Sequence, residues 1–136
     1  MRGAYLLILE LPEDTGILVG KQGMIHFQKG SYGYIGSALN GLEQRIRRHL
    51  RSNKKLHWHI DYLLASATIT GVFIKESSKR EECNLANAFE QSVDAIPGFG
   101  CSDCTCQSHL FFGPAKAMTK RATSQKMKPY PLDANP

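Results

Sequence analysis

The stretch Gly30–His49, GSYGYIGSALNGLEQRIRRH, holds a β-prone segment followed by a basic, amphipathic one. From Tyr32 to Gly36, aromatic and β-branched residues alternate with glycine, which predicts a strand. Asn40 is a residue type that caps helices. The apolar residues that follow recur at every fourth position, at Leu42, Ile46 and Leu50. The stretch therefore predicts a strand that leads into a helix over residues 40–51.

The residues before this stretch predict a small meander of strands. An apolar run over Ala4–Leu11 is followed by turn-forming residues 12–16 and a short strand over Ile17–Gly20, which together predict a β-hairpin. A second turn at residues 21–23 leads into another strand over Met24–Gln28.

The residues after it predict two more helices and further strands. We expect a short helix over Trp58–Leu64, a strand over Ala67–Ile74 and an amphipathic helix over Lys79–Ser92 with Cys83, Ala86 and 89–93 as its core stripe. A cysteine-rich turn then leads into a terminal strand. The predicted fold class is α+β, a small antiparallel or mixed sheet with helices packed on it. Residues 1–114 form the predicted domain, and residues 115–136 a basic, partly disordered extension in which 115–126 can form a helix.

Composition favours a folded protein with polyanionic partners. The 136 residues are 42% hydrophobic, enough for one core, and no apolar run is long enough to cross a bilayer. The net charge of +5 favours phosphate-bearing partners such as nucleic acid, with no membrane. At the N-terminus LLILEL is interrupted by acidic residues and Pro12, unlike a signal peptide, so we expect a cytoplasmic protein.

The ordered set of motifs resembles the GIY-YIG nuclease domains. Gly3-Ala4-Tyr5, then Tyr34-Ile35-Gly36, then a helix bearing Arg45 and His49 follow the order of that family. The combination of YGYIGSA, RIRRH, HWHIDYLL and GFGCSDCTCQSHLFF is similar to an uncharacterised GIY-YIG-like family, sometimes joined to DNA-repair glycosylases. Typical members place the two tyrosine motifs close together, whereas an additional predicted hairpin separates them here.

The resemblance implies a catalytic set of Tyr5, Tyr34, Arg45 and His49, with Glu82 as the ligand of Mg²⁺ or Mn²⁺. These residue types suit phosphodiester hydrolysis, which needs help for a nucleophilic water, for phosphate charge and for a leaving alkoxide. The fork of Arg45 can bind two phosphate oxygens, and His49, one turn on, can donate a proton. Glu81 stands beside Glu82 as an alternative metal ligand.

Further residues are candidates for supporting roles. In HWHIDYLL, His57, His59 and Asp61 could brace the site, since His57 and Asp61 are four residues apart in the predicted helix. The remaining arginines of the basic helix, Arg47, Arg48 and Arg51, are candidate nucleic-acid contacts.

The cysteine cluster supports a different hypothesis. Cys101, Cys104, Cys106 and His109 have the ligand types of a Zn²⁺ site, and Cys83 could replace one of them. The alternative is that these are buried thiols.

We therefore expect a metal-dependent endonuclease that hydrolyses phosphodiester bonds of nucleic acid, with DNA as the favoured substrate and structure-specific DNA repair as the expected role. Two alternatives stay open: a non-catalytic nucleic-acid-binding module that uses helix 40–51, and a zinc-stabilised interaction domain.

Overall fold

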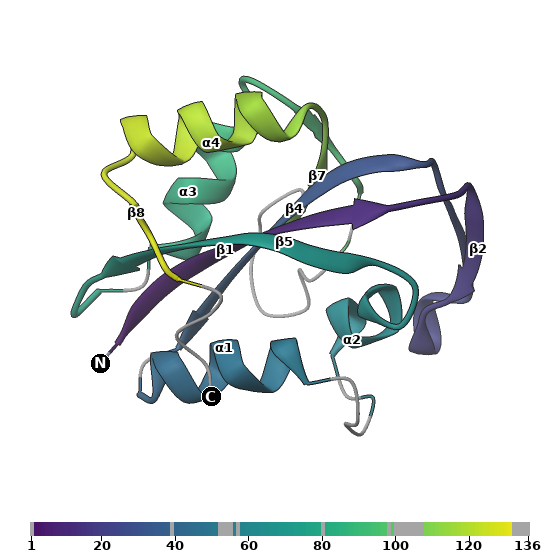
Figure 1. Cartoon of the computed structure of the whole chain (residues 1–136), viewed down its shortest axis with the longest axis horizontal. Helices are drawn as coiled ribbons and strands as arrows, with labels where there is room; N and C mark the ends of the chain where they lie inside the picture. Colours follow the sequence, from purple (N-terminus) through teal and green to yellow (C-terminus); the bar gives the residue numbers. More distant parts are fainter. Residues whose placement is uncertain are drawn as a thin grey trace.

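The computed structural model describes residues 2–38, 40–51, 56, 58–79, 81–97, 99 and 108–131, and the statements below concern these residues. They form a six-stranded antiparallel sheet in the order β6-β7-β4-β1-β5-β8, a separate β2-β3 ribbon and four α-helices (Figure 1). The strands are β1 (Gly3–Leu11), β2 (Thr15–Leu18), β3 (Met24–Phe27), β4 (Gly30–Ala38), β5 (Thr68–Glu76), β6 (Asp94–Ala95), β7 (Leu110–Phe112) and β8 (Lys128–Pro129). The helices are α1 (Leu42–Leu50), α2 (His59–Leu64), α3 (Glu82–Phe89) and α4 (Ala115–Ser124), with a 3-10 turn η1 (Gly20–Gln22). The expected α+β class is confirmed.

The apolar run of β1 is explained by its central position. β1 pairs along its whole length with β4, from Gly3 opposite Ala38 to Leu11 opposite Gly30, and on its other edge with β5. The predicted hairpin between Ala4–Leu11 and Ile17–Gly20 is wrong, because β2 pairs with β3 instead. A nine-residue strand buried on both faces needs long partners on both edges, and the four residues of β2 are too few to be one.

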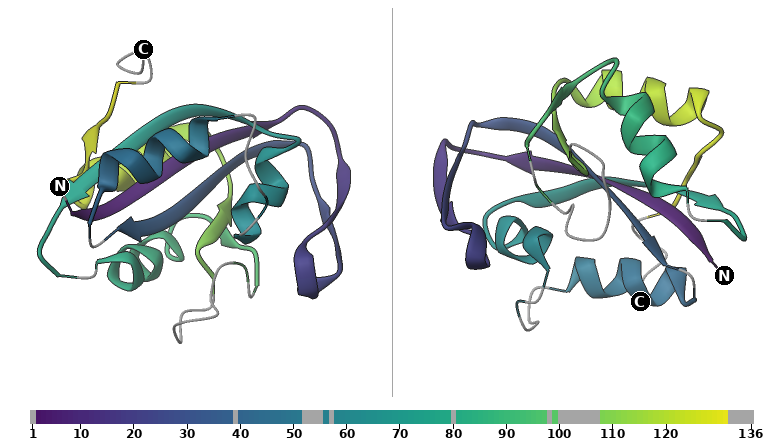
Figure 2. Two further views of the ribbon diagram at one scale, coloured as in Figure 1. Left: turned by 90° about the horizontal axis from the view of Figure 1, so that it is seen from below. Right: turned by 180° about the vertical axis from the view of Figure 1, so that it is seen from behind.

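Helices cover both faces of the sheet. Alternate residues of β1 belong to two separate core clusters, as the period of a strand requires. Tyr5, Leu7 and Leu9 pack with buried residues of α1 and α2, whereas Leu6 and Ile8 pack with those of α3 and α4. Figures 1 and 2 show these two helix pairs on opposite sides of the sheet.

Two helix predictions need correction at their ends. The N-cap of α1 is Gly41, in a left-handed conformation with φ of 72°, and Asn40 does not cap the helix. Helix α3 is shorter than predicted, because the hydroxyl of Ser77 accepts a hydrogen bond from the amide of Lys79 and holds a turn there. Cys83 is only partly buried and lies outside the core stripe of α3.

The segment after residue 114 packs on the same core as the segment before it. Met118 and Ala122 of α4 and Met127 beyond it are buried with residues of β1 and α3, and β8 pairs with the end of β5. Met118 and Ala122 are four residues apart and therefore lie on one face of the helix, although basic residues surround them in the sequence. Within the described ranges, no helix is long and apolar enough to span a membrane.

Candidate active site

Tyr5 and Gly36 form the base of the candidate site, because they are opposite each other on neighbouring strands. Tyr5 projects from β1 toward the face that α1 covers, and Gly36 is its register partner in β4. A Cβ atom at Gly36 would lie 2.4 Å from both Cζ and Oη of Tyr5. The phenol ring thus occupies the space that a side chain at position 36 would need, and only glycine leaves that space open.

Tyr34 and His49 join Tyr5 in one buried aromatic cluster. Tyr34 precedes Gly36 by two residues and so shares its face of the sheet, with its ring centroid 6.4 Å from that of Tyr5. His49 comes from the last turn of α1 and is 2% exposed, and its Nε2 atom shares a 2.7 Å hydrogen bond with Oη of Tyr5. The extra hairpin between the two tyrosine motifs is the β2-β3 ribbon, which leaves β1 and β4 paired side by side.

Burial and three neighbouring residues shift the pKa of Tyr5. Burial raises the pKa of Tyr5 well above 10.0, and the neighbouring Tyr34 and the carboxylate of Glu82 raise it further. The nearby positive charge of the Arg45 guanidinium lowers the pKa of Tyr5 in part. Arg45 also donates a 3.1 Å hydrogen bond to the carbonyl of Ser37.

The structure separates the two neighbouring glutamates at the start of α3. The carboxylate of Glu81 accepts 3.4 Å hydrogen bonds from Oγ of Ser77 and Nδ2 of Asn84. The carboxylate of Glu82 is the one whose charge acts on Tyr5. Helix α3 lies on the opposite face of the sheet from α1. Even so, the negative charge of Glu82, the first residue of α3, raises the pKa of Tyr5.

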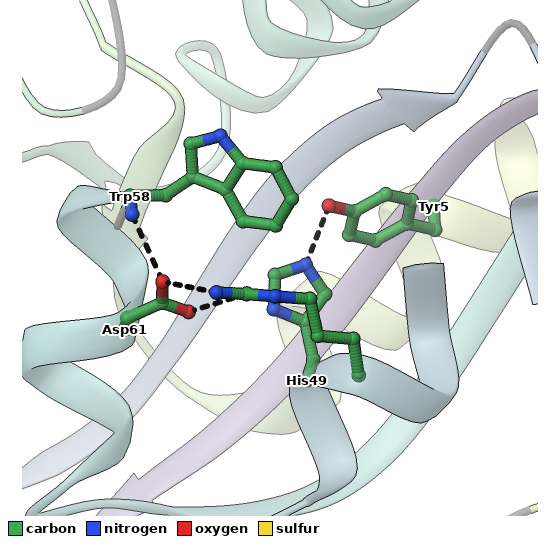
Figure 3. Close-up of polar contacts among 5 residues, drawn as sticks. Tyr5, His49, Trp58 and Asp61 are labelled. Carbon is green, nitrogen blue, oxygen red and sulfur yellow. Dashed lines mark hydrogen bonds and ion pairs between the residues drawn. The ribbon is translucent and has the colours of Figure 1, made fainter. Parts of the chain in front are cut away.

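Trp58 connects this cluster to a buried ion pair, and Figure 3 shows the arrangement. Asp61 is fully buried and accepts two hydrogen bonds from the guanidinium of Arg48, at 2.9 and 3.0 Å, and one from the backbone amide of Trp58 at 2.9 Å. The ring centroid of Trp58 lies 4.6 Å from Cζ of Arg45, 4.3 Å from Cζ of Arg48 and 5.7 Å from the ring of His49. The hydrogen bonds to Asp61 raise the pKa of Arg48.

This connection was not predicted from the sequence. Trp58 was read only as the start of a short helix, although its spacing from Asp61 is that of an N-cap residue and the third residue of a helix. His57, which was predicted together with Asp61 to brace the site, lies outside the described residues.

The arginines of α1 and its C-cap residue Arg51 differ in their surroundings. Arg45, Arg48 and Arg51 line an open groove of about 450 Å³ together with Asn40, Gly41 and Gln44. Arg47 is exposed and lies 3.8 Å from Glu43 at the next turn. Arg48 differs from its neighbours because its fork is bound to Asp61, which makes it part of the scaffold of the groove.

The remaining predicted residues do not join the cluster in the part of the chain that is described. The ring of His59 lies 5.6 Å from that of Phe99, and His109 is 4% exposed, with backbone hydrogen bonds to Phe99 and Ile35. Cys101, Cys104 and Cys106 lie outside the described residues. Among the residues that are described, no three His, Cys, Asp or Glu side chains are grouped to hold a metal ion. Zinc therefore stays a prediction.

The cluster combines groups that can move a proton beside an anion. A phenol with a raised pKa is protonated at neutral pH, and the hydrogen bond between Oη of Tyr5 and Nε2 of His49 is a path along which a proton can pass to the imidazole. The guanidinium next to the phenol favours negative charge there and can bind an oxyanion with two parallel hydrogen bonds.

A family model matches the chain. Residues 4–131 match the family described as a domain of unknown function, DUF123. This match covers nearly the whole chain, so the protein belongs to that family. Neither the curated proteins nor the solved structures contain a significant match.

Proposed function

We propose that this DUF123 domain hydrolyses phosphodiester bonds in nucleic acid, with a site of the GIY-YIG type around Tyr5. The observation that carries the proposal is the meeting of four residues predicted from the motifs. Nε2 of His49 lies 2.7 Å from Oη of Tyr5, the positive charge of Arg45 lowers the pKa of the same phenol, and the ring centroid of Tyr34 lies 6.4 Å from that of Tyr5. These residues come from β1, β4 and α1, so their meeting depends on the fold rather than on sequence proximity.

In this proposal Arg45 binds the scissile phosphate. Arg45 lines the open groove, its Nη1 atom donates to the carbonyl of Ser37, and its positive charge lowers the pKa of Tyr5. A guanidinium fork offers parallel hydrogen bonds to two phosphate oxygens, which also stabilises the charge that develops on them.

Tyr5 and His49 would handle the proton. Because the pKa of Tyr5 is raised, the phenol keeps its proton at neutral pH and cannot act as a resting base. The 2.7 Å hydrogen bond between Tyr5 and His49 would let a proton of the attacking water pass through the phenol to the imidazole, from which it can return to the leaving alkoxide. Tyr34 would orient the attacking water from the neighbouring position on β4.

Glu82 would hold the divalent cation, and the residues present fit such a group. A carboxylate is the hard oxygen ligand that Mg²⁺ and Mn²⁺ prefer, and Mg²⁺ commonly binds through one carboxylate, waters and substrate phosphate. The negative charge of Glu82 raises the pKa of Tyr5, which supports the assignment of this carboxylate to the proposed site. When bound, the cation would supply positive charge opposite the phosphate.

The arginine groove supports nucleic acid as the substrate, and DNA in a repair reaction remains our expectation. Arg45 and Arg51 line it on the α1 surface, and the whole chain carries a net charge of +5. Basic residues along one helix contact consecutive phosphates without reading the sequence.

The test is cleavage of nicked, branched and single-stranded DNA, and of RNA, with Mg²⁺ or Mn²⁺. We expect the wild type to cut at least one of these substrates and Arg45→Ala to lose roughly 100-fold or more in rate. Arg47→Ala is the matched control, since Arg47 is exposed and pairs only weakly with Glu43 on the same helix. Equal cutting by wild type and Arg45→Ala would assign the activity to another site or to a contaminant.

A non-catalytic binding module is the second candidate function, favoured by the groove itself. The arginines that line it would supply affinity for backbone phosphates even if no bond were cut. Salt-dependent binding of these substrates without cleavage under any metal condition would select this candidate. The zinc-stabilised interaction domain would instead require stoichiometric zinc in the purified protein.

A further inference from the structure

The β2-β3 ribbon presents two large apolar side chains to solvent. Leu18 and Met24 are register partners, so their side chains lie next to each other on one face of the ribbon. They are 62% and 59% exposed. The other face is anchored in the core through Ile17, Val19 and Phe27, which means that the exposed pair stands on a firmly packed support.

The ribbon lies at the opposite end of β1 from Tyr5 and next to α2. It extends beyond the six-stranded sheet at the end far from the N-terminus (Figures 1 and 2). Its turn packs against α2, where a Cβ atom added at Gly20 would lie 3.7 Å from Oη of Tyr62. Buried residues of α2 and α1 share one core cluster, so the ribbon adjoins the helix pair that carries the arginine groove.

The size of the pair and the charge around it favour one kind of partner. A stable protein interface buries roughly 800 Å² on each side, far more than two side chains supply. Residues 16–27 contain no Asp or Glu, and the whole chain is basic, which suits a polyanion. Proteins that bend DNA insert one or two apolar side chains such as Leu or Met between base steps.

We propose that Leu18 and Met24 form a wedge that inserts into the base stack of double-stranded DNA. This inference rests on the proposed function, because it takes nucleic acid as the substrate that the arginine groove holds. Insertion costs least where stacking is already weak, at nicks, branches and flexible pyrimidine–purine steps. The wedge would therefore direct the site toward interrupted or distorted duplexes.

The experiment measures base unstacking in the absence of divalent metal, so that it does not depend on cleavage. The probe is a nicked DNA duplex with 2-aminopurine beside the nick, whose fluorescence rises when the base leaves the stack. We expect a severalfold rise with wild type. Leu18→Ser combined with Met24→Ser should abolish most of the rise and retain most of the binding, which is measured separately by anisotropy. Circular dichroism checks folding, and Met24→Ser alone, expected to lose part of the rise, is the milder variant.

The matched control makes the same chemical change elsewhere. Leu56→Ser removes the third large apolar side chain exposed within the described residues, 48% exposed, and should leave the fluorescence rise intact. An equal loss in Leu56→Ser, or an unchanged rise in the double variant, would overturn the wedge. So would a wild-type dimer that becomes monomeric in the double variant. Absence of cleavage together with a rise that depends on Leu18 and Met24 would overturn only the proposed hydrolysis. Absence of any DNA binding would overturn both.

Discussion

Gly36→Ala perturbs the candidate site by a single methyl group. The added Cβ would lie 2.4 Å from Cζ and Oη of Tyr5. Ordinary contacts begin near 3.4 Å, so the phenol must move by about 1 Å, in a core that resists such shifts. This movement changes the separation of Oη from Nε2 of His49, which is 2.7 Å in the wild type. We expect a loss of about 1–3 kcal/mol in the free energy of unfolding.

The same displacement should have a large effect on cleavage. A misplacement of about 1 Å in a catalytic group can lower the rate about 100-fold. The assay pairs urea unfolding, followed by circular dichroism, with single-turnover cleavage at saturating protein, so that the rate reports on the folded fraction alone.

Two glycine variants serve as matched controls for Gly36→Ala. A Cβ atom at Gly71, on the other strand next to β1, would meet only Ile8 at 3.7 Å, so Gly71→Ala should be nearly neutral. A Cβ atom at Gly33 would meet Sδ of Met118 at 2.6 Å on the face of α4, so Gly33→Ala should cost stability without slowing cleavage. If Gly36→Ala kept both the stability and the cleavage rate of the wild type, the placement of Tyr5 against Gly36 would be wrong.

The remaining predictions concern the ion pair, the groove and the phenols. Asp61→Ala should lower the free energy of unfolding by about 3 kcal/mol, since it leaves the Arg48 guanidinium without its buried partner; a double-mutant cycle with Arg48→Met measures the coupling, and a coupling near zero would contradict the pairing. Arg51→Gln should weaken DNA binding and lower the salt slope by about one. Arg121→Gln, on the opposite face and bonded to Ser92, should change neither, and an equal effect of both variants would exclude the α1 groove. Because burial favours the neutral form of Tyr5 in the folded state, its stabilising contribution is complete below pH 10.0 and is lost as pH rises toward the raised pKa. Tyr5→Phe should therefore reduce the alkaline loss of stability in urea titrations, and an unchanged profile would argue against the burial of that phenol. In an ultraviolet titration Tyr32, whose pKa burial raises to about 12, should ionise late as well, and Tyr32→Phe should remove that late component.

The sequence predicted elements well and strand pairing poorly. The helix over residues 40–51 was found from the spacing of its apolar residues, which is a local property. The partners of β1 were not found, because pairing depends on which distant strand can cover both its edges. The nearest strand in the sequence looked like a hairpin partner, but it belongs to the separate ribbon.

The residues of the candidate site likewise divide into those that local motifs predict and those that only tertiary packing brings together. Tyr34, Arg45 and His49 were predicted from motif order, and the structure adds the reason why Gly36 belongs to the motif, namely the ring of Tyr5 lying across it. Trp58 was missed, because its role comes from two arginines of α1 and a carboxylate of α2 that only tertiary packing brings together.

The most direct test of the proposed function is the cleavage rate of Glu82→Gln compared with Glu81→Gln, on the preferred DNA substrate and over a range of Mn²⁺ concentrations. The two residues are neighbours in α3, but only Glu82 is proposed as a metal ligand, while Glu81 is bonded to Ser77 and Asn84. We expect Glu82→Gln to lose roughly 100-fold or more in rate and Glu81→Gln to stay close to wild type. Cleavage by Glu82→Gln at the wild-type rate, with the same Mn²⁺ dependence, would contradict the proposed active site.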